Sequence, residues 1–106
     1  MSEKVSTILK ELRRRLEVLY GHRLVCMVLY GSQARGDTEP GSDIDVLVVL
    51  KGSVHPGEEI ARTSQAVAEL SLQHNEVIAC LFVAEDRYER EQSPLLINVR
   101  REGVPV

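Results

Sequence analysis

Residues 24–50 read LVCMVLYGSQARGDTEPGSDIDVLVVL, and this stretch decides the fold. Its two ends, 24–30 and 43–50, are apolar runs rich in β-formers, too short for typical helices and typical of buried strands. Between them, residues 31–42 contain three glycines and a proline, which predicts a loop with a short helix near 32–35. The stretch therefore predicts two strands that a loop joins and that can pair antiparallel.

The N-terminal and central segments predict two helices. Residues 2–20 place apolar side chains at helical spacing with charges on the other face, so we predict a helix that Ser2 or Ser6 caps and Gly21 ends. Residues 58–72 predict a second helix, with acidic residues at its N-terminus, where the helix dipole favours them. The side chains expected to face the core are Val5, Ile8, Leu9, Leu12, Leu16 and Leu19, then Ile60, Ala66, Val67 and Leu70.

The last third of the chain predicts one more strand and two shorter helices. Residues 77–83 form a third apolar run of strand length. Residues 85–92 predict a short polar helix, the Ser-Pro pair at 93–94 fits the start of another, and residues 103–106 predict an extended tail. The order of elements predicts an α/β (α+β) fold, in which helices cover a small mixed β-sheet.

Composition limits the classes of function. The 106 residues fit one domain, 1–106, and the net charge of −3 argues against a general nucleic-acid binder. We interpret the run Arg13-Arg14-Arg15 as the solvated face of the first helix. No apolar run has the ~18 residues of a membrane helix and the N-terminus lacks an apolar signal segment, so we expect a cytoplasmic protein that contacts no membrane. Cys26 and Cys80 lie inside separate apolar runs, which favours buried, reduced thiols over a disulfide.

Two carboxylates open the second predicted strand. Asp43 and Asp45 are two positions apart, so both side chains leave the same face, with Cα atoms ~6.6 Å apart. Two such charges at ~5 Å repel by roughly 3 kcal/mol at an effective dielectric constant of ~20. A cation between them would remove this cost, and Mg²⁺, which binds one or two carboxylates together with substrate phosphates, is the natural candidate.

The Gly31-Ser32 step follows the first predicted strand directly. Glycine lets the backbone turn sharply and approach a ligand closely, and a helix that begins at Ser32 would present its free N–H groups to an anion. Arg35 could add a positive charge against phosphate. Each feature alone is more often structural, and no P-loop or dinucleotide motif is present. Their combination with Asp43 and Asp45 across one strand–loop–strand unit predicts a site for a metal-bound phosphate.

The string Gly31-Ser32-x-Ala34-Arg35-Gly36, followed by Ser42-Asp43-Ile44-Asp45, resembles the polymerase-β-type nucleotidyltransferase superfamily. Within it, the chain is similar to the minimal nucleotidyltransferase (MNT) group. The resemblance implies the fold of that superfamily, with Gly31 and Ser32 on the phosphates of the nucleotide. It also implies that Asp43 and Asp45 hold the Mg²⁺ ions of an in-line displacement at the α-phosphate.

The chain departs from the family in one respect. Family members usually carry a third carboxylate on the next core strand, and residues 77–83 contain no acid. We expect Ala79 to lie near the position of that acid. Glu76, just before the strand, is the close substitute, and its alternative interpretation is a solvated residue at the strand edge.

The resemblance also implies a partner. MNT proteins typically act with a helical HEPN protein as a toxin–antitoxin pair, in which the MNT chain is the antitoxin and can transfer AMP from ATP to a tyrosine hydroxyl of the toxin. The alternative is a catalytically weak or inactive antitoxin that neutralises its HEPN toxin by binding, and the missing acid favours it. A small-molecule hydroxyl as acceptor ranks last. A homo- or hetero-oligomer is compatible with either.

Overall fold

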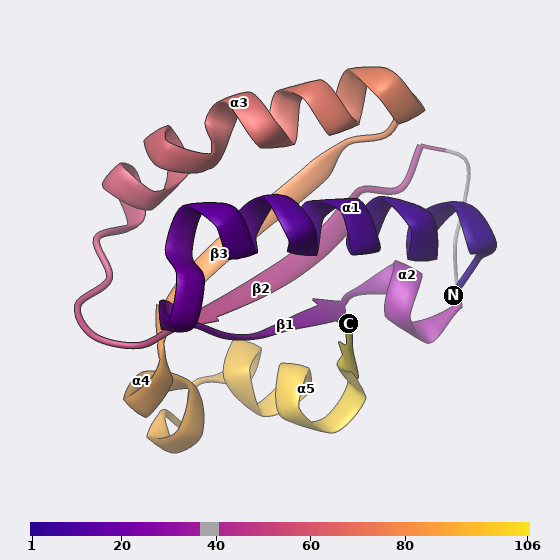
Figure 1. The fold of residues 1–106 in the computed structure, drawn as a ribbon. Helices are drawn as coiled ribbons and strands as arrows, with labels where there is room; N and C mark the ends of the chain where they lie inside the picture. Colours follow the sequence, from indigo (N-terminus) through magenta and orange to yellow (C-terminus); the bar gives the residue numbers. More distant parts are fainter. Residues whose placement is uncertain (37–40) are drawn as a thin grey trace.

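A four-stranded mixed sheet runs through the middle of the molecule (Figure 1). The structure is a computed structural model that describes residues 1–36 and 41–106. β1 pairs antiparallel with both β2 and β4, whereas β2 and β3 are parallel. The predicted mixed sheet and the antiparallel pairing of the first two strands are therefore confirmed. In sheet order, the strands are β3 (Ile78–Ala84), β2 (Ile44–Leu50), β1 (Leu24–Tyr30) and β4 (Val104–Pro105).

The C-terminal tail forms the fourth strand, where the sequence predicts only extended chain. Val104 pairs with Leu29 of β1, and the Val106 N–H donates to the Met27 carbonyl oxygen at 3.0 Å. A strand of two residues has no periodicity that a sequence pattern can reveal. Its pairing depends on where the preceding helix delivers the chain.

Helices cover both faces of the sheet (Figure 1). The Ser2 and Ser93 hydroxyls accept hydrogen bonds from the third residue after each of them, which confirms both predicted caps. No helix of residues 1–36 and 41–106 combines the length and apolar character needed to cross a membrane. One face of the sheet is covered by α1 (Glu3–Tyr20) and α3 (Pro56–His74), and the other by α4 (Glu85–Arg90) and α5 (Pro94–Glu102). Two short elements flank β1: the 3₁₀ turn η1 (Gly21–Arg23) precedes it, and α2 (Ser32–Arg35) follows it.

Each pair of helices encloses its own apolar cluster, and β2 contributes to both. Ile44, Val46 and the later even-numbered residues of β2 pack beneath α1 and α3. Leu47 and Val49 pack instead against the side chains of α4 and α5. Because strand side chains alternate, Asp45 points to the same side as Leu47, away from α1 and α3. Burial on both faces is the reason that β2 appears in the sequence as an unbroken apolar run.

Two side chains predicted to face the core lie outside it. Leu19 is 42% exposed and Ile60 is 56% exposed, so both predictions are wrong. Tyr20 fills the last core position of α1, because it continues the four-residue spacing of Leu12 and Leu16. Leu19 then falls at the edge of that stripe, where α1 faces α3.

The two cysteines are free thiols on β1 and β3. Both Cys26 and Cys80 are free, as predicted, but they are partly exposed and so less buried than the sequence predicts. Burial nevertheless raises the pKa of the Cys80 thiol to about 12, which keeps it protonated.

The carboxylate of Glu59 is buried between α1 and α3. It accepts a hydrogen bond from the Tyr20 hydroxyl at 2.9 Å and another from the His55 N–H at 3.2 Å. The Arg62 guanidinium lies 3.5 Å away. The sequence assigns Glu59 only to the helix dipole, but the structure makes it the polar link between the end of α1 and the start of α3.

Candidate functional site

The C-terminal end of β1 and the N-terminal end of β2 lie side by side, at the same end of the two central strands. In the antiparallel register Tyr30 lies opposite Asp45, so the chain leaves β1 through Gly31 directly beside the Asp45 carboxylate. A Cβ atom added to Gly31 would lie 2.6 Å from Asp45 Oδ2, closer than such atoms approach in real structures. Glycine is therefore required here, and the turn and the acid form one site.

The Gly31 backbone has a conformation that other residues rarely adopt. Its φ of 75° and ψ of −156° lie in a region that is essentially restricted to glycine. The Gly31 carbonyl accepts hydrogen bonds from the N–H groups of Ala34 and Arg35 at 3.2 Å, which starts α2 at Ser32. The predicted short helix at 32–35 is thus confirmed, with its first turn at the end of β1 (Figure 1).

Asp43, just before β2, and Asp45, on β2, lie close enough for their charges to affect each other. Asp43 is exposed and Asp45 is partly buried. Burial and, after it, the nearby Asp43 charge raise the pKa of Asp45 above its ordinary value. In residues 1–36 and 41–106 neither carboxylate accepts a hydrogen bond or forms an ion pair. The pair is therefore an electronegative position with capacity for a cation.

Tyr30 shares this environment. Burial, and then the negative charge of Asp45, raise the pKa of the Tyr30 phenol. The hydroxyl stays protonated at neutral pH, so Tyr30 contributes a polar but uncharged neighbour to the site.

Comparisons with known proteins agree with this geometry. The sequence pattern of the nucleotidyltransferase domain family matches residues 5–95. The chain belongs to the nucleotidyltransferase domain family. A protein of Methanocaldococcus jannaschii with the name "putative protein adenylyltransferase" is 35% identical over 48 residues, which are 45% of this chain and 48% of the relative. This nucleotidyltransferase domain thus spans about half the length of the curated relative that it matches.

A solved structure has the same fold. The crystal structure of "a putative nucleotidyltransferase" from Sulfolobus solfataricus superposes with a TM-score of 0.67 and 18% sequence identity. The match covers 99% of this chain and 87% of the other. Family and fold together agree on a nucleotidyltransferase, as the motif predicts.

Gln33 is a residue of the nucleotidyltransferase site that sequence reasoning missed. Its side chain is buried, and Nε2 donates to the Ser42 carbonyl oxygen at 3.4 Å. This contact connects α2 to the segment just before Asp43. The sequence offered one signal for this contact: Gln33 lies between the glycine turn and Ala34, and a glutamine amide that becomes buried needs a hydrogen-bond partner.

Arg35, the predicted phosphate contact, lies at the exposed end of α2. Its Nη1 is 3.7 Å from Glu102 Oε2 of α5. Arg35 is thus near the turn in sequence and space, and its ion pair links α2 to α5. Asp37 and Glu39, interpreted from sequence as loop solvation, lie outside the described residues.

The structure does not bring Glu76 together with the two aspartates. Glu76 precedes β3 and forms an ion pair with Lys4 of α1 at 3.0 Å, on the side of the sheet opposite to Asp45. Ala79 is the residue of β3 in register with Asp45. Within residues 1–36 and 41–106, no three His, Cys, Asp or Glu residues are grouped so that they could hold a metal ion. The residue of β3 beside Asp45 therefore carries a methyl group and not a carboxylate.

Proposed function

We propose that this chain transfers AMP from ATP to a hydroxyl of a partner protein, with Mg²⁺, in the cytoplasm. The partner would be a HEPN toxin, and this chain its antitoxin. The observation that carries the proposal is the contact distance between Gly31 and Asp45, because it unites a phosphate-binding type of turn with a pair of metal-binding acids. The name of the Methanocaldococcus jannaschii relative supports a protein as acceptor and an adenylyl group as cargo.

Asp43 and Asp45 would hold Mg²⁺. The donor set fits this ion, since Mg²⁺ uses one or two carboxylates and completes its ligands with substrate phosphates and water. Burial and, after it, the Asp43 charge raise the pKa of Asp45, and a divalent cation would relieve the repulsion between the two carboxylates. When bound, the ion supplies Lewis-acid stabilisation of charge on the phosphates.

Gly31 and Ser32 would bind the phosphates of the nucleotide. Gly31 has no side chain between the α2 backbone and the acids, and the Ser32 hydroxyl adds a donor. Arg35, one turn of helix later, would oppose negative charge on the departing pyrophosphate. In the reaction, the acceptor oxygen forms a bond to the α-phosphorus while the bond from that phosphorus to the pyrophosphate oxygen breaks.

One observation favours a second candidate function. Ala79, not an acid, lies in register with Asp45, so among the described residues the site has two carboxylates. A chain with this site would bind Mg²⁺ and nucleotide but transfer slowly, and would neutralise its partner by forming a complex. Glu76 as a substitute acid would have to leave Lys4.

The experiment is incubation of the full chain with ATP, Mg²⁺ and the proposed HEPN partner, followed by intact-mass measurement. Transfer predicts that the partner gains one or more adenylate masses, that Asp43→Ala abolishes the gain, and that Asp86→Ala preserves it. Asp86 is a matched control because it is an exposed aspartate on α4. Unchanged mass with a stable complex supports the second candidate.

Substitution of Ala79 separates a slow site from an absent one. Ala79→Asp should raise the transfer rate by about tenfold or more if the third carboxylate limits the reaction, whereas Ala79→Asn, of similar size but uncharged, should not.

A melting experiment comes before the transfer assay. Mg²⁺-ATP at ~100 times its Kd should stabilise the wild type by about 2.7 kcal/mol. If Mg²⁺-ATP gives no stabilisation and no adenylate is transferred, the chain has no working nucleotide site.

A further inference from the structure

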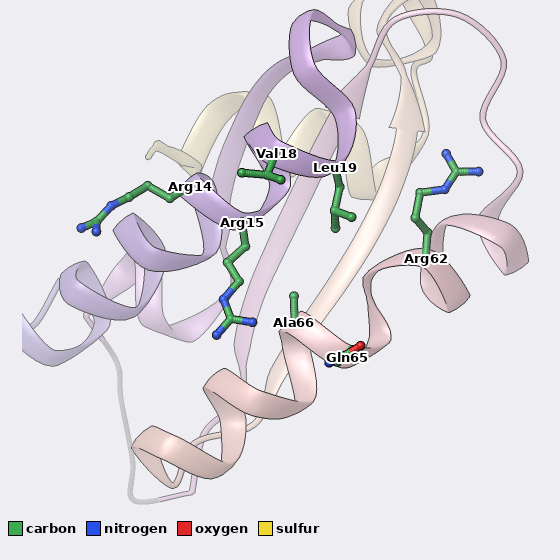
Figure 2. A pocket seen from close by; sticks show the side chains of 7 residues that line it. All are labelled: Arg14, Arg15, Val18, Leu19, Arg62, Gln65 and Ala66. Atoms are coloured by element: carbon green, nitrogen blue, oxygen red, sulfur yellow. The ribbon is translucent and has the colours of Figure 1, made fainter.

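A groove runs between α1 and α3 on the outer side of the helix layer (Figure 2). Its volume is about 380 Å³. Three arginines, three apolar residues and one glutamine line it: Arg14, Arg15 and Arg62, with Val18, Leu19 and Ala66, and Gln65. Figure 2 shows Leu19 directed from α1 toward α3 and Ala66 directed back toward α1. The groove is formed by helix faces and lies on the opposite side of the sheet from the Asp45 side chain.

The apolar part of the groove is unusually exposed. Val18 is 87% exposed and Leu19 is 42% exposed, although both lie on the helix that supplies much of the core. Each follows an arginine by four residues, so Arg14 lies one turn from Val18 and Arg15 one turn from Leu19. The surface therefore offers two parallel rows, each with a cation beside an apolar side chain.

The charge of the groove is opposite to that of the whole chain. Its lining contains arginines and no carboxylate, whereas the chain carries a net charge of −3. Arg15 pairs with Glu69 at 2.5 Å, and Arg62 lies over the Tyr20 ring and 3.5 Å from Glu59. Arg14 has no ion-pair partner in residues 1–36 and 41–106. An acidic ligand could therefore pair with Arg14, and could also contact Arg15 and Arg62 beside their existing carboxylate partners.

We propose that this groove binds an amphipathic helix of a partner protein, whose apolar stripe is flanked by acidic residues. Apolar side chains at helical spacing would cover Val18 and Leu19, as in other helix-in-groove complexes. Carboxylates beside that stripe would pair with Arg14 and Arg15, for which the planar guanidinium is well suited. The proposal gives Arg14 and Arg15 a role beyond solvation, whereas Arg13 bonds Glu17 and the Val106 carbonyl oxygen.

A protein helix fits the groove better than a nucleic acid. Single-stranded nucleic acids bind basic grooves through bases stacked on aromatic rings, and the groove lining contains no aromatic residue. The acidic balance of the chain also opposes polyanion binding. The inference does not rest on nucleotidyl transfer, so a failed transfer assay leaves it unaffected.

The test uses three synthetic peptides and the full, isotope-labelled chain. The first peptide carries leucines at alternating three- and four-residue spacing with glutamates on both flanks. The second replaces every glutamate with lysine, and the third scrambles the first. Nuclear magnetic resonance titration should show that the first peptide alone shifts the amides around Arg14, Val18 and Ala66. A single-stranded oligonucleotide is titrated in parallel.

Matched double variants locate the binding. Arg14→Glu/Val18→Glu should weaken binding of the acidic peptide by about tenfold or more. Leu72→Glu/Arg101→Glu makes the same change in charge at a leucine that is 84% exposed and an exposed arginine, both outside the groove, and should change binding less than about twofold. Melting curves check that both variants fold. No peptide-induced shift, equal weakening by the two variants, or binding of the oligonucleotide in place of the peptide would overturn the proposal.

Discussion

Asp45 and Glu59 are two carboxylates on ordered elements with opposite surroundings. Glu59 is 2% exposed, and its oxygens accept hydrogen bonds from Tyr20 and His55, with Arg62 close by. Burial alone would raise the pKa of Glu59, but these contacts outweigh it and lower the pKa. Asp45 has a raised pKa, from burial and from the charge of Asp43.

The difference separates a structural acid from the acid that we propose as a metal ligand. Glu59 is satisfied inside the chain, so it links α1 to α3 and has no capacity left for a ligand. Asp45 lies against Gly31 and has no hydrogen bond or ion pair within the described residues, so its charge is not satisfied by them. Burial by itself therefore does not indicate a site, whereas an unrelieved charge near the start of β2 indicates a candidate site.

The largest effect is expected for Glu59→Ala. Removal of the carboxylate leaves the buried Tyr20 hydroxyl unpaired and releases the His55 N–H, so the free energy of unfolding should fall by about 2–4 kcal/mol. Glu58→Ala is the matched control, because Glu58 is an exposed acid in the same turn of α3 and should change stability by less than about 0.5 kcal/mol. Urea unfolding measures the stability of both variants. Equal losses for Glu59→Ala and Glu58→Ala would show that Glu59 has no special structural role.

Gly31→Ala tests whether the space beside Asp45 is essential. The new Cβ would meet Asp45 Oδ2 at 2.6 Å and the backbone conformation would be strained, so stability should fall by about 2–3 kcal/mol and Mg²⁺-ATP stabilisation should disappear. Gly36→Ala is the control, since Gly36 also has a positive φ, 78°, with nothing within 4 Å of the added atom. It should cost about 1 kcal/mol and preserve the response to Mg²⁺-ATP. Equal losses of stability and equal responses to Mg²⁺-ATP in the two variants would contradict the close approach of Asp45 to Gly31.

Asp45→Asn should have the opposite sign to the Glu59 variant. Loss of one of two neighbouring negative charges should raise the free energy of unfolding of the nucleotide-free chain by about 0.5–1 kcal/mol. The same variant should lose the stabilisation by Mg²⁺-ATP. Thermal melting with and without the ligand measures both effects, and a destabilised apo variant would show that Asp45 is satisfied within the fold after all.

The smallest expected effect is the pH dependence of the stability differences between wild type and the variants of Glu59 and Asp45. Because the folded-state pKa of Glu59 is lowered, its contribution to stability is present above its ordinary value of 4.5 and is lost as the pH falls through the folded value. For Asp45, whose folded-state pKa is raised above 3.8, the destabilisation present at neutral pH is relieved as the pH falls through the folded value. The stability differences of Glu59→Gln and Asp45→Asn from wild type should therefore both shrink toward acid pH, with opposite signs. Urea unfolding at several pH values checks this, and a difference for Asp45→Asn that grows in acid would reverse the assignment.

Local patterns were sufficient for most of the fold and for the core of the site. The apolar runs predict β1, β2 and β3 to within one residue, and helical spacing predicts α1 and α3 to within about two. Glycine, serine and two aspartates at their spacing predict that turn and acids share a site, because a strand–loop–strand unit returns the chain to the same edge. In each case the information lies in a short segment whose period or backbone geometry follows from its own residues.

The sequence by itself thus determined the mixed α/β architecture, the turn at Gly31 and the acidic pair at Asp43 and Asp45. Only the tertiary structure decided the two-residue strand β4, the burial of Glu59 against Tyr20, the contact from Gln33 to Ser42, and the pairing of Glu76 with Lys4. The physical reason is that these features depend on how separate segments meet in space. A helical period tells which face is apolar, but not which neighbour supplies a hydrogen bond, so long-range polar partners appear only after the helices have packed on the sheet.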